Sequence, residues 1–121
     1  MVKMDSVKIS DFSIGGHNYV RRGYKYRVKD ILTIADNLTE FEIPISGIDI
    51  GIMPWKIDTI KEFCYHVNRL NNCNFDKPVI LDDEGCICDG WHRVAKAVLE
   101  GKLTITAKRL LVMPEDCGKS D

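Results

Sequence analysis

The sequence predicts a single α+β domain in which a small mixed sheet is flanked by helices. Short runs rich in β-branched residues alternate with segments whose apolar residues recur at helical spacing. The 121 residues are close to the common size of one domain, and no repeat, low-complexity segment or interdomain linker divides them. We therefore expect one domain over 1–121. Within it, 1–39 reads as a less regular N-terminal extension and 114–121 as a polar tail that frays.

The first third of the chain predicts two extended segments and a helix. Residues 6–14 alternate weakly between apolar and polar positions before Gly15-Gly16 breaks the pattern. Residues 19–28 are rich in tyrosine and predict a second extended segment. A short helix of about three turns should follow, because the next apolar residues have helical spacing. They are Ile31, Ile34, Ala35 and Leu38.

The middle of the chain predicts an interrupted strand and an amphipathic helix. Residues 42–45 and 48–50 read as a strand broken at Ser46-Gly47, and Pro44 suits a sheet edge. The segment 57–70 then separates into an apolar and a polar face, a pattern typical of a helix that packs its apolar face on a core. The apolar face carries Ile60, Phe63, Cys64, Val67 and Leu70; the polar face carries Asp58, Glu62, His66 and Arg69.

The last third predicts a hairpin, a helix and a returning strand. Val79–Leu81, the acidic turn 82–85 and Cys86–Cys88 form the hairpin pattern. Gly101 ends the helix that follows, and 102–113 supply the final strand. The expected buried stripe of this helix consists of Trp91, Val94, Ala95, Val98 and Leu99.

The turn Asp89-Gly90-Trp91-His92-Arg93 is the most informative stretch of the chain. It opens a helix, and helix N-termini bind anions through unsatisfied N–H groups and the positive end of the dipole. His92 and Arg93 lie off the expected apolar stripe, which favours an anion ligand over a solvated surface. On this interpretation Arg93→Ala should leave the fold nearly intact. Asp89 is either an N-cap or a base or cation ligand, and Trp91 is either core or a stacking surface for a base.

Several of these residues together resemble the ParB/sulfiredoxin-like superfamily, and within it the small stand-alone ParB-like nuclease proteins of bacteria and phages. The resemblance is carried by Lys77-Pro78-Val79-Ile80-Leu81, the acidic turn, Asp89-Gly90-Trp91-His92-Arg93, Ala95, Ala97, Gly101 and Thr104-Ile105-Thr106-Ala107. It implies a compact domain with a small mixed sheet. Gly90 and Arg93 match the two fixed positions of a Gly-x-x-Arg box that binds nucleotide phosphates in ParB proteins. Trp91 stands where sulfiredoxins carry their catalytic Cys, so sulfiredoxin chemistry is not expected.

The resemblance implies a nucleotide- or phosphate-binding protein, an NTP hydrolase or a phosphotransferase. The Asp-Gly-x-His-Arg form is similar to that of free-serine kinases of the superfamily, and the implied ligand is ATP, ADP or CTP, with Mg²⁺. Small relatives often carry a His-x-x-Arg that matches His66 and Arg69. The expected catalytic residues are Asp89, His92 and His66, and the expected phosphate or nucleotide ligands are Gly90, Trp91, His92, Arg93 and Arg69. Glu40 and Glu42 are further candidate bases, because the kinases carry an essential Glu in the N-terminal part.

A second hypothesis is a nucleic-acid-associated, partition-like or nuclease-like accessory protein. Basic residues interleaved with tyrosines can follow a phosphate backbone and stack bases, although a half-buried strand with a solvated face has the same pattern. The segment contains Arg21, Arg22, Lys25, Arg27 and Lys29 with Tyr19, Tyr24 and Tyr26. ParB proteins read specific DNA through a separate helix-turn-helix domain, so only nonspecific contact is expected here. A third hypothesis is a non-catalytic inhibitor of a phage or mobile element that uses the fold as a scaffold.

Composition argues against several other classes. The net charge of −1 provides no overall attraction to nucleic acid. Five scattered cysteines without a paired Cys-x-x-Cys predict buried thiols rather than a metal site. The first residues lack the apolar core of a signal peptide, and no apolar run reaches the roughly 20 residues of a membrane span. We therefore expect a cytoplasmic protein with no membrane partner.

Overall fold

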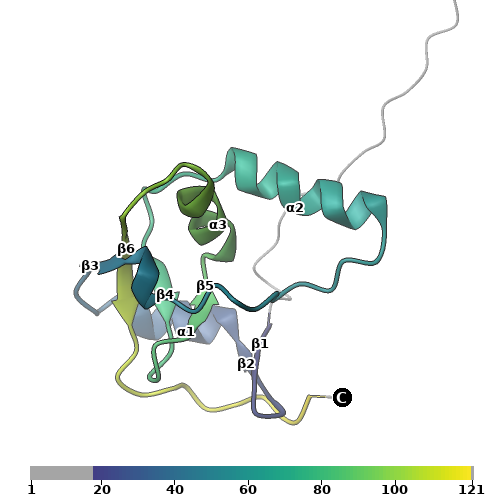
Figure 1. Ribbon diagram of the computed structural model, residues 1–121. Coiled ribbons are helices and arrows are strands. Elements are labelled where there is room, and N and C mark those ends of the chain that lie inside the picture. Colours follow the sequence, from purple (N-terminus) through teal and green to yellow (C-terminus); the bar gives the residue numbers. More distant parts are fainter. Residues whose placement is uncertain (1–17, 121) are drawn as a thin grey trace, which may run out of the picture.

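A four-stranded mixed sheet lies at the centre of the computed structural model, which describes residues 18–120 (Figure 1). The strand order is β3 (Phe41–Pro44), β6 (Thr104–Arg109), β4 (Val79–Leu81) and β5 (Ile87–Asp89). β6 runs antiparallel to β3 and parallel to β4, and β4 runs antiparallel to β5. The expected α+β class is confirmed, and Pro44 ends an edge strand, where a missing N–H is tolerated. The strand expected over 6–14 lies outside the described residues.

The two faces of the sheet bury separate apolar clusters, because successive side chains of a strand point to opposite sides. On one face, Val79 and Leu81 pack with Val94 and Ala97 of α3 (Trp91–Leu99). On the other face, Ile80 packs with Ile31 and Ala35 of α1 (Val28–Ala35). Helices α1 and α3 therefore cover opposite faces of one sheet.

The buried stripe expected on α3 is wrong in its C-terminal half. Val94 and Ala97 are the buried residues of this helix, whereas Val98 is 41% and Leu99 74% exposed. Trp91 packs against the first cluster, so the buried face consists of residues three apart. The start of α3 is held close to β4 at Val79, which decides the face that the helix turns to the sheet.

Residues 48–50 are not the strand that was expected. After Pro44 the chain forms a short 3₁₀ turn, η1 (Ile45–Gly47), and Ile48 enters the first core cluster. Residues 49–59 then follow without a helix or strand, up to the start of the next helix at Ile60. We call residues 49–59 the strap. Pro44 has no N–H for a further ladder bond, which explains why the strand ends here.

The tyrosine-rich segment is a hairpin rather than one extended segment. β1 (Asn18–Arg21) pairs antiparallel with β2 (Tyr24–Arg27) across a two-residue turn. Both turn residues have positive φ, 52° at Arg22 and 80° at Gly23, as the tight turns of hairpins require. The C-terminal segment bonds to the same hairpin: Cys117 N–H donates to Lys25 O at 2.8 Å and Lys25 N–H to Gly118 O at 2.9 Å. The segment predicted to fray is thus held along β2.

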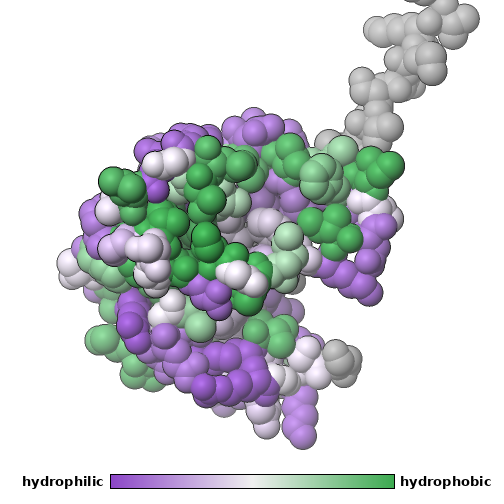
Figure 2. Space-filling model, viewed as in Figure 1, coloured by the Kyte–Doolittle hydropathy of each residue, from purple (hydrophilic) through white to green (hydrophobic). Residues whose placement is uncertain are grey.

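Helix α2 (Ile60–Asn72) exposes the face that was expected to be buried. Thr59 caps it by accepting a hydrogen bond from Glu62 N–H, but none of its residues is buried. Ile60 is 84% and Phe63 57% exposed, and Figure 2 shows hydrophobic residues on the surface along α2. The polar face, with His66 and Arg69, is instead the partly buried one. No helix within residues 18–120 is long and apolar enough to cross a membrane.

Candidate functional site

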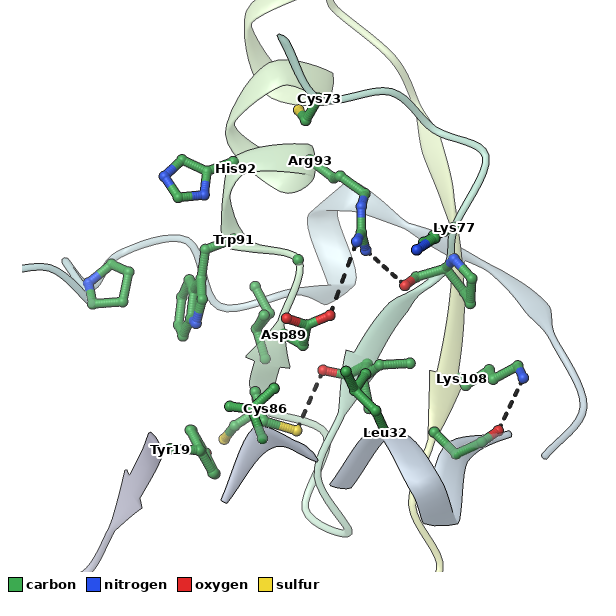
Figure 3. A pocket seen from close by; sticks show the side chains of 18 of the residues that line it. Tyr19, Leu32, Cys73, Lys77, Cys86, Asp89, Trp91, His92, Arg93 and Lys108 are labelled. Carbon is green, nitrogen blue, oxygen red and sulfur yellow. Dashed lines mark hydrogen bonds and ion pairs between the residues drawn. The ribbon is translucent and has the colours of Figure 1, made fainter. Parts of the chain in front are cut away.

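An open cleft of about 960 Å³ runs along β5, one of the two edge strands of the sheet. Residues 18–20 of β1 and the inner side of α1 line one part of it, and Ile52, Pro54 and Trp55 of the strap line another. The start of α3 also lines the cleft, together with Arg69 of α2 and Lys77, which precedes β4. All five residues of the turn 89–93 contribute to the lining (Figure 3). The fold therefore brings six of the seven sequence-predicted residues of the phosphate site to one cavity.

Gly90 connects β5 to α3 in a conformation that a side chain would disturb. It is the N-cap of α3, with φ 96° in the left-handed region that favours glycine. A Cβ atom there would lie 2.9 Å from Arg93 Nη1 and 3.2 Å from Val79 Cα. The glycine is thus required by the approach of the turn to β4.

Arg93 is part of the framework of the turn as well as of the cleft wall. Its Nη1 donates to Pro78 O at 2.8 Å, and its Nη2 lies 3.9 Å from Asp89 Oδ2 (Figure 3). Both side chains are about one-fifth exposed. This corrects the expectation that Arg93→Ala would leave the fold nearly intact. The guanidinium has five N–H donors, so these contacts do not exhaust it.

Asp89 is not the N-cap of α3. It ends β5, and the cap position belongs to Gly90, which makes no side-chain cap bond. The Asp89 carboxylate lies instead beside the Arg93 guanidinium on the wall of the cleft. Of the two roles that the sequence left open, capping is therefore excluded.

His66 and His92 meet although 26 positions separate them in the sequence. His66 Nδ1 and His92 Nε2 are 3.0 Å apart, and the two rings are inclined by only 17°. The Trp55 indole stacks on both rings, with each pair of ring centroids 4.3 Å apart. His92 lines the cleft, whereas His66, on α2, is not among the residues that line it. The packing of α2 beside α3, which no sequence pattern predicts, brings the two rings together.

The environment of His66 disfavours its charged form. Burial lowers the pKa of His66, and the nearby Arg69 lowers it further, while Glu62 acts in the opposite direction. The net result is a pKa below the ordinary value for histidine. At neutral pH this imidazole is neutral and can accept or donate a hydrogen bond.

The basic residues of the hairpin form ion pairs with the acidic turn. Arg21 forms an ion pair with Asp83, and its Nη1 lies 3.4 Å from Asp82 Oδ2. Arg22 forms an ion pair with Glu84. Of the four residues expected at a nucleic-acid interface, these two are engaged within the molecule, whereas Lys25 and Arg27 are not in ion pairs of the described residues.

Asp82 is the buried centre of this contact, with 0% of its surface exposed. It accepts hydrogen bonds from Tyr19 OH and from the N–H groups of Glu84 and Cys86, each at 2.9 Å. Burial alone would raise the pKa of Asp82, but these donors and Arg21 outweigh it and lower the pKa. No sequence pattern singled out Asp82 within the acidic turn.

The two glutamates proposed as bases lie away from the cleft. Glu42 is on β3, at the sheet edge opposite β5, and accepts a hydrogen bond from Thr106 Oγ1. Glu40 directly precedes β3, and both glutamates are exposed. Neither residue lines the cleft, so their assignment as bases of this site is wrong.

The cysteines of the described residues are all unpaired thiols, and no group of three or more His, Cys, Asp or Glu in residues 18–120 could hold a metal ion. Cys88 is buried, whereas Cys64, Cys86 and Cys117 are exposed, so the expectation of buried thiols is wrong for these three. Ile87 shares the first core cluster and Cys88 the second, as strand alternation requires. Burial raises the pKa of both Cys86 and Cys88, so neither thiol is activated.

Sequence reasoning did not include Lys77 among the residues of the site. Lys77 reaches the cleft because Pro78 leads directly into β4, next to the turn. No family model, curated protein or solved structure matches the chain. The function is therefore argued from the cleft itself.

Proposed function

We propose that the chain binds a nucleotide, or a similar phosphorylated small molecule, in the cleft along β5. On this proposal it acts on the phosphate groups as an NTP hydrolase or a phosphotransferase. The observation that most supports this is the convergence of the turn 89–93 with Arg69 and Lys77 on one cavity. Cleft walls that carry several cations and a helix N-terminus are suited to a polyanionic ligand.

Phosphate groups would lie at the start of α3. The first N–H groups of a helix lack partners within the helix, and the N-cap Gly90 has no side chain to satisfy them. Arg93 and His92 extend from the same turn, and Arg69 and Lys77 line the adjoining wall. An arginine held by Pro78 O is pre-oriented, which reduces the entropy lost on binding a phosphate.

The two histidines are suited to proton transfer in such a reaction. A base is most effective when a second group fixes its orientation, and His66 does this for His92 through the 3.0 Å contact. Asp89 is the nearby carboxylate. Because phosphoryl transfer depends mainly on positioning and on charge stabilisation, the chain needs few groups beyond these.

Mg²⁺ would enter with the nucleotide rather than occupy a site built by the protein alone. Mg²⁺ commonly binds one or two carboxylates together with substrate phosphates. Asp89 is the carboxylate of the turn that fits this role, since it lines the cleft. The ion would neutralise phosphate charge, and Asp89 would fix its place.

The nucleic-acid hypothesis has less support, because Arg21 and Arg22 are engaged with the acidic turn. If the hairpin did bind nucleic acid, affinity would fall steeply with salt and the substitution of Lys25 and Arg27 would weaken it. The inhibitor hypothesis differs in predicting no turnover.

The proposal is tested by thermal unfolding with ATP, ADP, CTP and GTP, each with and without Mg²⁺. A ligand that binds only the folded state stabilises it by RT ln(1 + [L]/Kd), so a true ligand raises Tm with concentration. Arg93→Ala should weaken binding by about 1.5–3 kcal/mol, the range for a hydrogen bond to a charged group. It should also lower the free energy of unfolding by about 1–2 kcal/mol, because the bond to Pro78 O is lost.

Arg27→Ala is the matched control, since Arg27 is exposed and does not line the cleft. It should leave both nucleotide binding and Tm unchanged. Phosphate release should require His92 in the nucleotide-bound protein, so His92→Gln should bind without turnover. No Tm shift with any nucleotide at millimolar concentration would reject nucleotide binding. Binding without any turnover in the wild-type protein would favour the inhibitor hypothesis.

A further inference from the structure

The strap is attached to the rest of the molecule through few side chains. Residues 49–54 are all exposed, and the partly buried residues of the strap are Trp55 and Ile57. Trp55 stacks on His66 of α2 and on His92 of α3. Three separate segments therefore meet at one aromatic contact, and the strap residue in it also lines the cleft.

The contact between the two imidazoles depends on their protonation. A hydrogen bond between His66 Nδ1 and His92 Nε2 needs one N–H donor and one lone-pair acceptor. A neutral pair satisfies this, and a pair with one added proton satisfies it with a stronger, charge-assisted bond. A second proton makes both nitrogens donors and places two positive rings side by side. The bond is then lost and the rings repel each other.

The surroundings of the pair act on its protonation in both directions. On α2, Arg69 and the burial of the ring lower the pKa of His66, while Glu62 raises it. On α3, Arg93 follows His92 directly in the sequence. The Asp89 carboxylate lies beside the Arg93 guanidinium on the cleft wall. In the strap, Lys56 adjoins Trp55 and pairs with Asp58. Tyr65 meets His66 edge-on.

We propose that Trp55, His66 and His92 form a pH-sensitive latch that holds the strap over one wall of the cleft. The latch is closed while the pair carries no proton or one proton beyond the neutral state. Double protonation breaks the hydrogen bond between the two imidazoles. The rings then separate, the Trp55 indole loses the pair of rings on which it stacks, and the strap moves away. Acid thus widens the cleft, whichever ligand the cleft takes.

Nuclear Overhauser cross-peaks between the Trp55 indole and the two imidazoles test the latch in the full chain, titrated from pH 7.5 to 4.5. The wild-type protein should show the cross-peaks at pH 7.5 and lose them at the acid end. The ring signals should titrate in two separate steps, as expected for a coupled pair. At pH values above the second pKa of the pair, the fraction of molecules with an open strap should rise about tenfold for each unit by which the pH is lowered, because opening requires one further proton.

Two variants keep one hydrogen bond but cannot become doubly charged. In His66→Asn the side-chain amide replaces Nδ1, and in His92→Gln it replaces Nε2. Either variant should retain stacking between Trp55 and the remaining imidazole down to pH 4.5, with circular dichroism confirming the fold. Cross-peaks that persist in the wild-type protein at pH 4.5 would overturn the proposal. Loss of the cross-peaks at pH 4.5 in both variants would also overturn it. The same holds if both variants lack the cross-peaks at pH 7.5.

Discussion

Gly90 shows how one backbone position sets the geometry of the site. Its positive φ and its approach to Val79 and Arg93 are separate constraints, and they can be measured separately. Gly90→Ala should lower the free energy of unfolding by about 2–3 kcal/mol, because the strained φ and the short contacts both contribute. Urea denaturation measures this change.

Gly101 provides a matched control for that substitution. It has φ 71°, but an added Cβ would meet nothing within 4 Å. Gly101→Ala should therefore cost only the strain of the left-handed backbone, about 1 kcal/mol. Equal losses in the two variants would show that the approach to β4 contributes nothing.

Asp82 makes a prediction about acid stability. Its pKa is lowered in the folded protein, so its contribution is present above the unfolded pKa and is lost as pH falls through the folded value. With an unfolded pKa of about 3.9, the loss should occur below about pH 4. Asp82→Asn should lower the free energy of unfolding at pH 7 by about 3 kcal/mol, since it leaves buried donors facing an amide.

The pH dependence of the free energy of unfolding distinguishes the role of the buried Asp82 carboxylate from a general effect of charge. Unfolding measured from pH 7 to pH 2.5 should be less acid-sensitive in Asp82→Asn than in the wild-type protein. Asp83→Asn is the control, because Asp83 is one-third exposed and its pair with Arg21 should contribute less than about 1 kcal/mol. Parallel pH profiles for wild type and Asp82→Asn would contradict this assignment.

Helix α2 makes a prediction at the scale of an element. Its apolar face is exposed, so Phe63→Ala should change the free energy of unfolding by less than about 0.5 kcal/mol. Val94→Ala in α3 should cost about 2 kcal/mol, because Val94 is buried in the first core cluster. Chemical denaturation of the two variants compares these values. A large loss in Phe63→Ala would place this face of α2 against a core.

The C-terminal segment makes a prediction for the whole molecule. It runs beside the hairpin and hydrogen-bonds to its backbone. Ser120 N–H donates to Gly23 O at 2.7 Å, and residues 117 and 118 bond to Lys25. Removing residues 114–121 should lower stability by about 1–3 kcal/mol and speed amide exchange at Lys25. The central sheet should remain folded, because its two core clusters contain residues no later than Met113. Leu111→Ala, a change at an exposed position, should leave the Lys25 amide protected.

Local patterns in the sequence determined most of the elements of the sheet. The β4–β5 hairpin was predicted within one residue, and the helices at 28–35, 60–72 and 91–99 overlap the predicted segments. Apolar periodicity and turn residues suffice for this, because both act within a few positions. The position of Gly90 and Arg93 at the junction of strand and helix was also predicted from local sequence, since strand, turn and helix start lie within a few residues.

Tertiary structure alone decided which faces are buried and which residues meet. Periodicity shows that α2 has two faces but not which one turns inward, and packing beside α3 placed the polar face inside. The same packing brought His66 and His92 together, with Trp55 stacked on both rings. The strand order placed Glu42 on β3, at the sheet edge away from the cleft. These outcomes depend on contacts between segments far apart in the chain. The free energies of such contacts are set by the whole fold, so no local pattern specifies them.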